Sequence, residues 1–123
     1  MNSVARDHLP QILSGVTAAY SVAILAYPNI LAKPSGYVSA AGTAPRPVRT
    51  TIRAIGARDL AISVATLLAP DASARRSAVA ARAASDYADA LIFAHGLPRG
   101  KRSKIAGFAI LWGSAHAYTL VGR

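Results

Sequence analysis

The 123-residue chain contains no cysteine and no glutamate, and each absence excludes something. Without cysteine there is no disulfide framework, no thiol nucleophile and no thiolate metal site. Glutamate normally joins lysine on the exposed faces of soluble helices. Its absence, together with 53% hydrophobic and only 15% charged residues, indicates helices whose outer faces are apolar.

The motifs of several enzyme classes are also missing. The glycines form no phosphate-binding loop, and no serine lies in a nucleophile elbow. The histidines and aspartates do not have the spacing of a metal site. We therefore expect no metal ion and no cofactor.

The positive charge of the chain lies mostly in short groups between apolar segments. The net charge of +9 is compatible with a nucleic-acid partner. However, cationic loops that flank apolar segments are typical of membrane spans, and the basic turn 99–102 has no aromatic platform beside it. We therefore expect membrane lipids as the partner, with no nucleic acid.

Four segments have the length of a membrane span. Residues 9–32 contain no charged side chain, and 105–122 contain only the titratable His116, so both approach the ~20 apolar residues that a span needs. Two further segments carry internal charges and are separated from the first by the Pro- and Gly-rich stretch 34–47. We predict a single all-α domain, a four-helix transmembrane bundle in the cell membrane, with helices at about 9–28, 49–69, 73–96 and 103–122.

Smaller signals support this division. Asp71 or Ser73 is placed to cap the third helix, and residues 96–100 end it. Small residues recur every four positions in two rows, which predict close helix approach or reflect a general bias toward alanine. The rows are Ala57, Ala61, Ala65 and Ala69, and Ala109, Gly113 and Ala117.

Three of the five aspartates lie inside the two charged segments. Each acid or arginine there would cost about 2.5–3.5 kcal/mol at a bilayer centre, so these groups should face the interior and pair. Depth along the two helices can be counted from the turn near 70–72 at a rise of ~1.5 Å per residue. Three arginine–aspartate pairs then lie at matching depths, which predicts a neutral cluster. The predicted pairs are Asp59–Arg82, Arg58–Asp86 and Arg53–Asp89.

Other interior residues complete a candidate site. Arg82, Asp86 and Asp89 share one helix face, and His116 lies at a similar depth on the last helix. Histidine is the natural proton shuttle near neutral pH, and a buried carboxylate is suited to acid–base work. The catalytic candidates are Asp59, Asp86, Asp89 and His116, and the substrate-binding candidates are Arg53, Arg58, Arg82, Tyr20 and Trp112.

The run Arg53-Ala-Ile-Gly56-Ala-Arg58-Asp59 resembles the G-x-R-D signature of a family of small four-span membrane proteins from bacteria and fungi, whose function is unknown. The later pattern of Arg82, Asp86 and Asp89 is similar to the third helix of that family. The resemblance covers nearly the whole chain. It implies four helices in which these charged residues have the same role as in the other members of the family. It implies no activity.

Three functions remain open at this point. The first is a membrane protein that binds or converts a small hydrophobic molecule by acid–base chemistry, as in an isomerisation, hydration or cyclisation. The second is a non-enzymatic membrane subunit whose buried ion pairs are structural. The third is a soluble, basic, helical homo-oligomer.

Overall fold

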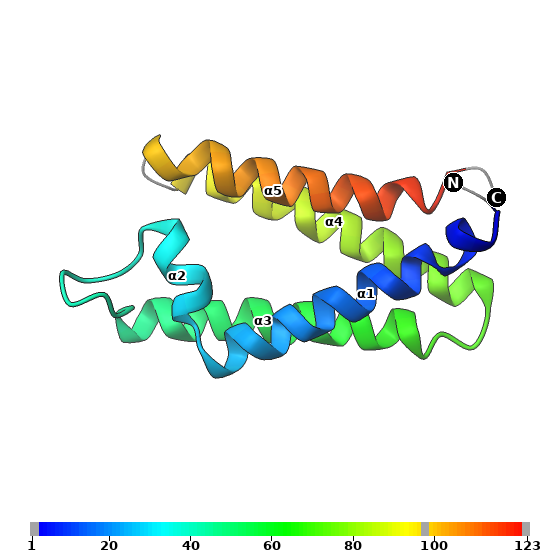
Figure 1. Cartoon of the computed structure of the whole chain (residues 1–123), viewed down its shortest axis with the longest axis horizontal. Helices are drawn as coiled ribbons and strands as arrows, with labels where there is room; N and C mark the ends of the chain where they lie inside the picture. Colours follow the sequence, from blue (N-terminus) through cyan, green and yellow to red (C-terminus); the bar gives the residue numbers. More distant parts are fainter. Residues whose placement is uncertain (1–2, 97–98, 122–123) are drawn as a thin grey trace.

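The computed structural model describes residues 3–96 and 99–121, without the side chains of Ala5, Arg99, Lys101 and Arg102. Figure 1 shows that these residues form helices with no strand among them, and that a longer loop, 36–45, joins the second helix to the third. The all-α prediction is confirmed. The helices are α1 (Ser3–Ala26), α2 (Asn29–Ser35), α3 (Arg46–Leu67), α4 (Ala72–Gly96) and α5 (Arg99–Tyr118).

The long helices pack as two antiparallel pairs. In Figure 1, α1 lies along α3 in one layer and α5 lies along α4 in the other, and α3 contacts α4 between the layers. Each pair packs closely at one glycine. A Cβ atom on Gly56 of α3 would lie 3.0 Å from Ile24 Cγ1 of α1, and one on Gly113 of α5 would lie 2.9 Å from Asp86 Cβ of α4.

The short helix α2 was not predicted, because its residues lie in the region assigned to the first connection. It follows Pro28 and ends at Gly36, whose φ of 78° places it in the left-handed region that glycine adopts easily. Ala32 of α2 is fully buried against Ile24 of α1 and Ile52 of α3. This tertiary contact stabilises a helix that Pro34 would otherwise disfavour.

The predicted helix ends are close to the observed ones. Asp71 caps α4, since its Oδ1 accepts a hydrogen bond of 2.8 Å from the backbone N–H of Ala74. Gly96 ends α4, whereas Leu97, Pro98 and Gly122 lie outside the described residues. The helix predicted from residue 9 begins earlier, at Ser3, and continues through Pro10.

The two predicted rows of small residues have different outcomes. Ala57, Ala61 and Ala65 are exposed, so the first row makes no close helix contact within the chain. Gly113 is buried in the α4–α5 contact, so close helix approach is confirmed at this one position of the second row.

One segment of the described residues, Arg6–Ala26 in α1, is long and apolar enough to cross a membrane. Core helices of soluble proteins and signal sequences meet the same criterion. The internal charges of α3 and α4 lower the hydropathy of those helices, and the four-span arrangement therefore stays a prediction.

Polar and apolar side chains are distributed unusually over these helices. The buried face of α1 includes the polar residues Ser14, Thr17 and Ser21, while Val16 and Val22 on the same helix are exposed. On α5, His116 is buried and Leu111 is 66% exposed. Polar groups thus gather inside the fold beside a small hydrophobic core, while many large apolar side chains lie on its surface.

Candidate functional site

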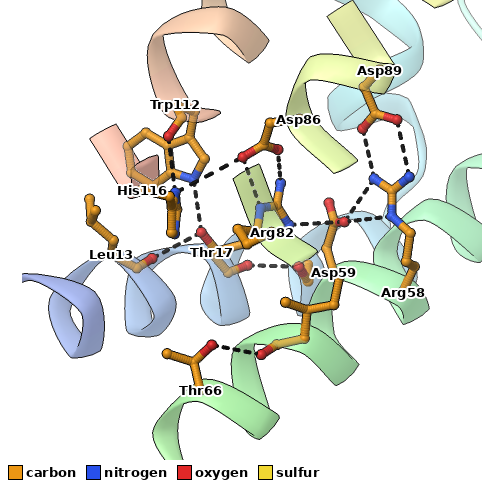
Figure 2. Close-up of polar contacts among 12 residues, drawn as sticks. Leu13, Thr17, Arg58, Asp59, Thr66, Arg82, Asp86, Asp89, Trp112 and His116 are labelled. Atoms are coloured by element: carbon orange, nitrogen blue, oxygen red, sulfur yellow. Dashed lines mark hydrogen bonds and ion pairs between the residues drawn. The ribbon is translucent and has the colours of Figure 1, made fainter. Parts of the chain in front are cut away.

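Six ionisable side chains meet where α3, α4 and α5 come together, as Figure 2 shows. Two come from α3, three from α4 and one from α5. We call them the charged cluster: Arg58, Asp59, Arg82, Asp86, Asp89 and His116. It contains all four of the predicted catalytic residues and two of the predicted arginines.

Arg58 connects the two layers. Its Nη1 and Nη2 atoms donate to the two carboxylate oxygens of Asp89 at 3.0 and 2.7 Å. Its Nε and Nη2 also donate to Oδ1 of the neighbouring Asp59, at 3.0 and 2.9 Å. A bidentate arginine–carboxylate pair fixes direction as well as distance, so this contact holds α3 and α4 in register.

Arg82 makes the second set of contacts. It donates through Nε to Asp86 Oδ2 at 3.0 Å and through Nη2 to Asp86 Oδ1, one helical turn away on α4. Its Nη1 lies 2.9 Å from Asp59 Oδ1 on α3. The side chains of Arg82 and Asp86 are only 7% and 4% exposed, so this pair lies deep in the fold.

The predicted pairing is partly confirmed. Asp59 and Arg82 do meet, but Arg58 pairs with Asp89 and Asp59 instead of Asp86, which is bound by Arg82. The prediction matched residues by depth alone. The actual partners also depend on the direction in which each side chain projects from its helix axis, and on the local (i, i+4) pair within α4.

Arg53 does not join the cluster, which corrects the predicted neutral set. It is exposed, and its Nε donates to the backbone oxygen of Leu25 at 3.1 Å. Arg53 projects from α3 about 120–140° around the axis from Arg58 and Asp59. Two arginines and three aspartates remain, so the charged cluster carries a formal charge of −1 while His116 is neutral.

His116 is the member of the charged cluster that comes from α5, and it lies next to Asp86, at the depth that the sequence predicted. Its Nδ1 is 4.0 Å from Asp86 Oδ2 and 3.0 Å from the backbone oxygen of Trp112. A carbonyl oxygen only accepts, so Nδ1 carries the hydrogen in that contact. Nε2 is buried and has no hydrogen-bond partner among the described residues. His116 is therefore held beside Asp86 with its second ring nitrogen buried and unbonded within the described residues.

Trp112 joins α5 to α1 through a hydrogen bond. Its Nε1 donates to Thr17 Oγ1 at 2.9 Å, and this hydroxyl donates in turn to the backbone oxygen of Leu13 at 2.9 Å (Figure 2). Trp112 also packs edge-on against the ring of His116, with the ring centroids 5.8 Å apart. The two rings thus support each other next to Asp86.

An apolar cavity of about 540 Å³ lies between α1 and α5 and reaches the charged cluster. Its volume is that of a site for a small organic molecule. Three carboxylates line it, those of Asp59, Asp86 and Asp89. Tyr20 and Trp112 also line it, as predicted, while Arg58 and His116 are not among its described lining residues and stand behind the carboxylates.

Two aromatic lining residues were missed by sequence reasoning. Phe93 of α4 and Phe108 of α5 both border the cavity, and the Phe108 ring stacks on Trp112 with a centroid distance of 5.9 Å. The spacing of four residues between Phe108 and Trp112 was a usable signal, because it places both rings on one helix face.

The described residues contain no grouping of three or more histidine, cysteine, aspartate or glutamate side chains arranged to hold a metal ion. Comparison with known proteins gave no matching family model, no matching curated protein and no matching solved structure. The resemblance to the G-x-R-D family therefore stays a prediction, and function has to be argued from the site itself.

Proposed function

We propose that the chain is an integral membrane protein that binds a small hydrophobic molecule in the apolar cavity and converts it by acid–base chemistry. One observation carries this proposal: three carboxylates, with Arg82 and Lys104 beside them, line a cavity whose remaining wall is mostly apolar. A carboxylate in an apolar, water-poor site is a common acid or base in catalysis.

The distribution of charge along the helices supports the membrane part of the proposal. Within 9–26, 54–67, 77–94 and 105–118, every charged residue belongs to the charged cluster. These segments are about 20–27 Å long, against a hydrocarbon core of about 30 Å. Flanking arginines and lysines can extend toward the headgroups and cover the difference.

Each member of the site has a proposed role. Asp86 or Asp89 gives or takes the proton, and His116 relays protons to Asp86 from behind the cavity wall. Arg58 and Arg82 orient the carboxylates, while Tyr20 and Trp112 pack against the apolar body of the substrate. The reaction class is an isomerisation, hydration or cyclisation, each of which an acid and a base can promote, and a hydration also consumes one water molecule.

The test compares the small molecules that remain bound to the purified chain. The wild type and the double variant Asp86→Asn/Asp89→Asn are extracted in mild detergent, and bound compounds are identified by mass spectrometry. The double variant should retain an unconverted compound that the wild type holds in converted form. A matched control is Asp7→Asn/Asp71→Asn, which removes two exposed aspartates. Identical compounds in all three proteins, at normal expression, would remove the acid–base proposal.

The arrangement of the ion pairs favours a second candidate, a non-enzymatic membrane subunit. Arg58–Asp89 and Arg82–Asp59 join α3 to α4, where few other contacts hold the two helix pairs together. Under this function the charged cluster only fixes helix register. The exchange Arg58→Asp/Asp89→Arg should then restore the expression that each single variant loses, whereas an active site would stay inactive after the exchange.

A further inference from the structure

The charge of the cluster and the wall of the cavity point to the chemical class of the ligand. We propose that the apolar cavity binds a hydrophobic monocation, with its positive charge against Asp59 and its apolar body against the aromatic side chains. This inference rests on the proposed function, because it assumes that the cavity is a binding site, and it adds the charge of the molecule bound there.

The first step concerns Asp59. All its contacts with arginine go to one carboxylate oxygen: Oδ1 accepts from Arg58 and lies 2.9 Å from Arg82 Nη1. Its other oxygen, Oδ2, accepts no hydrogen bond from the described residues. Asp59 is buried and lines the cavity. Asp59 therefore lines the cavity and keeps one carboxylate oxygen without a hydrogen bond from the described residues.

The second step concerns charge. The charged cluster holds two arginines and three aspartates, and an excess negative charge in apolar surroundings is unfavourable unless a positive group offsets it. His116 offsets it only when protonated. Two cationic residues also border the cavity, Arg82 and Lys104. Arg82 is already counted in the charge of the cluster. The Lys104 side chain is exposed, and it lies about 13 Å along α5 from Gly113, the residue against which Asp86 packs. A cation in the cavity would supply the missing charge directly.

The third step concerns the rest of the wall. Tyr20 of α1 and the stacked rings of Phe108 and Trp112 of α5 border the same space. Aromatic faces attract cations that have lost their water, most strongly when the site is dry. The wall therefore suits a cation with a weakly hydrated, apolar body, such as a tertiary amine or a quaternary ammonium or phosphonium ion. It does not suit a small hydrated metal ion.

The experiment measures binding of three probes of similar shape to the full chain in detergent, by isothermal titration calorimetry. The probes are tetraphenylphosphonium, triphenylphosphine oxide and tetraphenylborate, which carry one positive charge, none and one negative charge. The cation should bind at least about tenfold more tightly than the neutral probe, and the anion more weakly than both.

Variants test where the selectivity comes from. Asp59→Asn should reduce cation affinity to that of the neutral probe, while the control Asp71→Asn, outside the cavity, should not. Because Asp59→Asn removes part of the cluster, a second pair keeps the ion pairs intact. Ala109→Lys and Ala109→Met place chains of similar length in the cavity wall, and only the lysine variant should lose the preference for the cation.

The outcomes separate this inference from the proposed function. Tight binding of the neutral probe with no preference for the cation would overturn the inference and leave a hydrophobic binding site intact. A preference for the cation that survives both Asp59→Asn and Ala109→Lys would also overturn it, because the charge would then be recognised elsewhere. Failure of all three probes to bind would remove the binding site and, with it, both proposals.

Discussion

Arg82 contacts carboxylates on two helices, Asp86 on its own α4 and Asp59 on α3. Both acids are buried. A buried ion pair adds little stability compared with apolar side chains of the same size, but removal of one partner leaves an uncompensated charge. At the scale of the residue, the charged cluster is therefore sensitive to loss of Arg82 in particular.

Replacement of Arg82 by methionine should destabilise the protein by about 3–5 kcal/mol, because two buried carboxylates lose a partner. The measurement is thermal unfolding in detergent, followed by circular dichroism. Arg46→Met is the matched control on an exposed side chain, with an expected change within about 0.5 kcal/mol. Equal melting temperatures for the two variants would show that Arg82 contacts water and that the cluster is not sealed.

The pairing of α4 with α5 depends on close backbone approach at one position. A Cβ atom on Gly113 would lie 2.9 Å from Asp86 Cβ and 3.5 Å from the backbone oxygen of Ala83. A contact of 2.9 Å forces one of the two helices to move. Because Asp86 is both the neighbour of Gly113 and a member of the charged cluster, helix packing and site geometry are coupled here.

Substitution of Gly113 by alanine should therefore destabilise the protein by about 1–3 kcal/mol through overpacking. Gly107 on the same helix has no atom within 4 Å of an added Cβ. There the same substitution should stabilise α5 by about 0.5–1 kcal/mol, since alanine has the higher helix propensity. Thermal unfolding of both variants tests the contrast, and a gain in stability at Gly113 would contradict the close approach of α4 and α5.

Among the described residues, many large apolar side chains are exposed while most of the charged cluster is buried. Large exposed side chains such as Leu91, Ile92 and Leu111 lie on α4 and α5, level with the buried cluster. Apolar patches of this extent mark a surface covered by lipid or by another protein. The proposed membrane location and the soluble oligomer both supply such a cover, so only an experiment on the intact protein separates them.

The chain should stay in the membrane fraction after carbonate and high-salt washes and should be released only by detergent. Leu111→Arg, at a side chain that is 66% exposed, should reduce insertion by about 2.5–3.5 kcal/mol. Leu111→Ala is its control and should insert almost normally. Release of the wild type without detergent would favour the soluble oligomer and contradict the four-span arrangement.

The sequence was sufficient to predict the four long helices and every member of the charged cluster, but it also placed Arg53 inside, where the structure shows it exposed. The apolar segments of spanning length, Asp71 as a cap and Gly96 as a stop are local signals that can be read from the sequence. The inward position of Asp59, Asp86 and Asp89 also follows from one-dimensional information, since these are the only acids inside long apolar stretches.

Only the tertiary structure decided which of these charges meet. Depth along a helix can be counted from the sequence, but direction around the axis and the spacing of neighbouring helices cannot. For this reason Arg53 bonds to α1, Arg58 pairs with Asp89, and the predicted neutral cluster has a net negative charge. Helix α2 and the cavity between α1 and α5 also depend on contacts between segments far apart in the chain, and no local pattern encodes them.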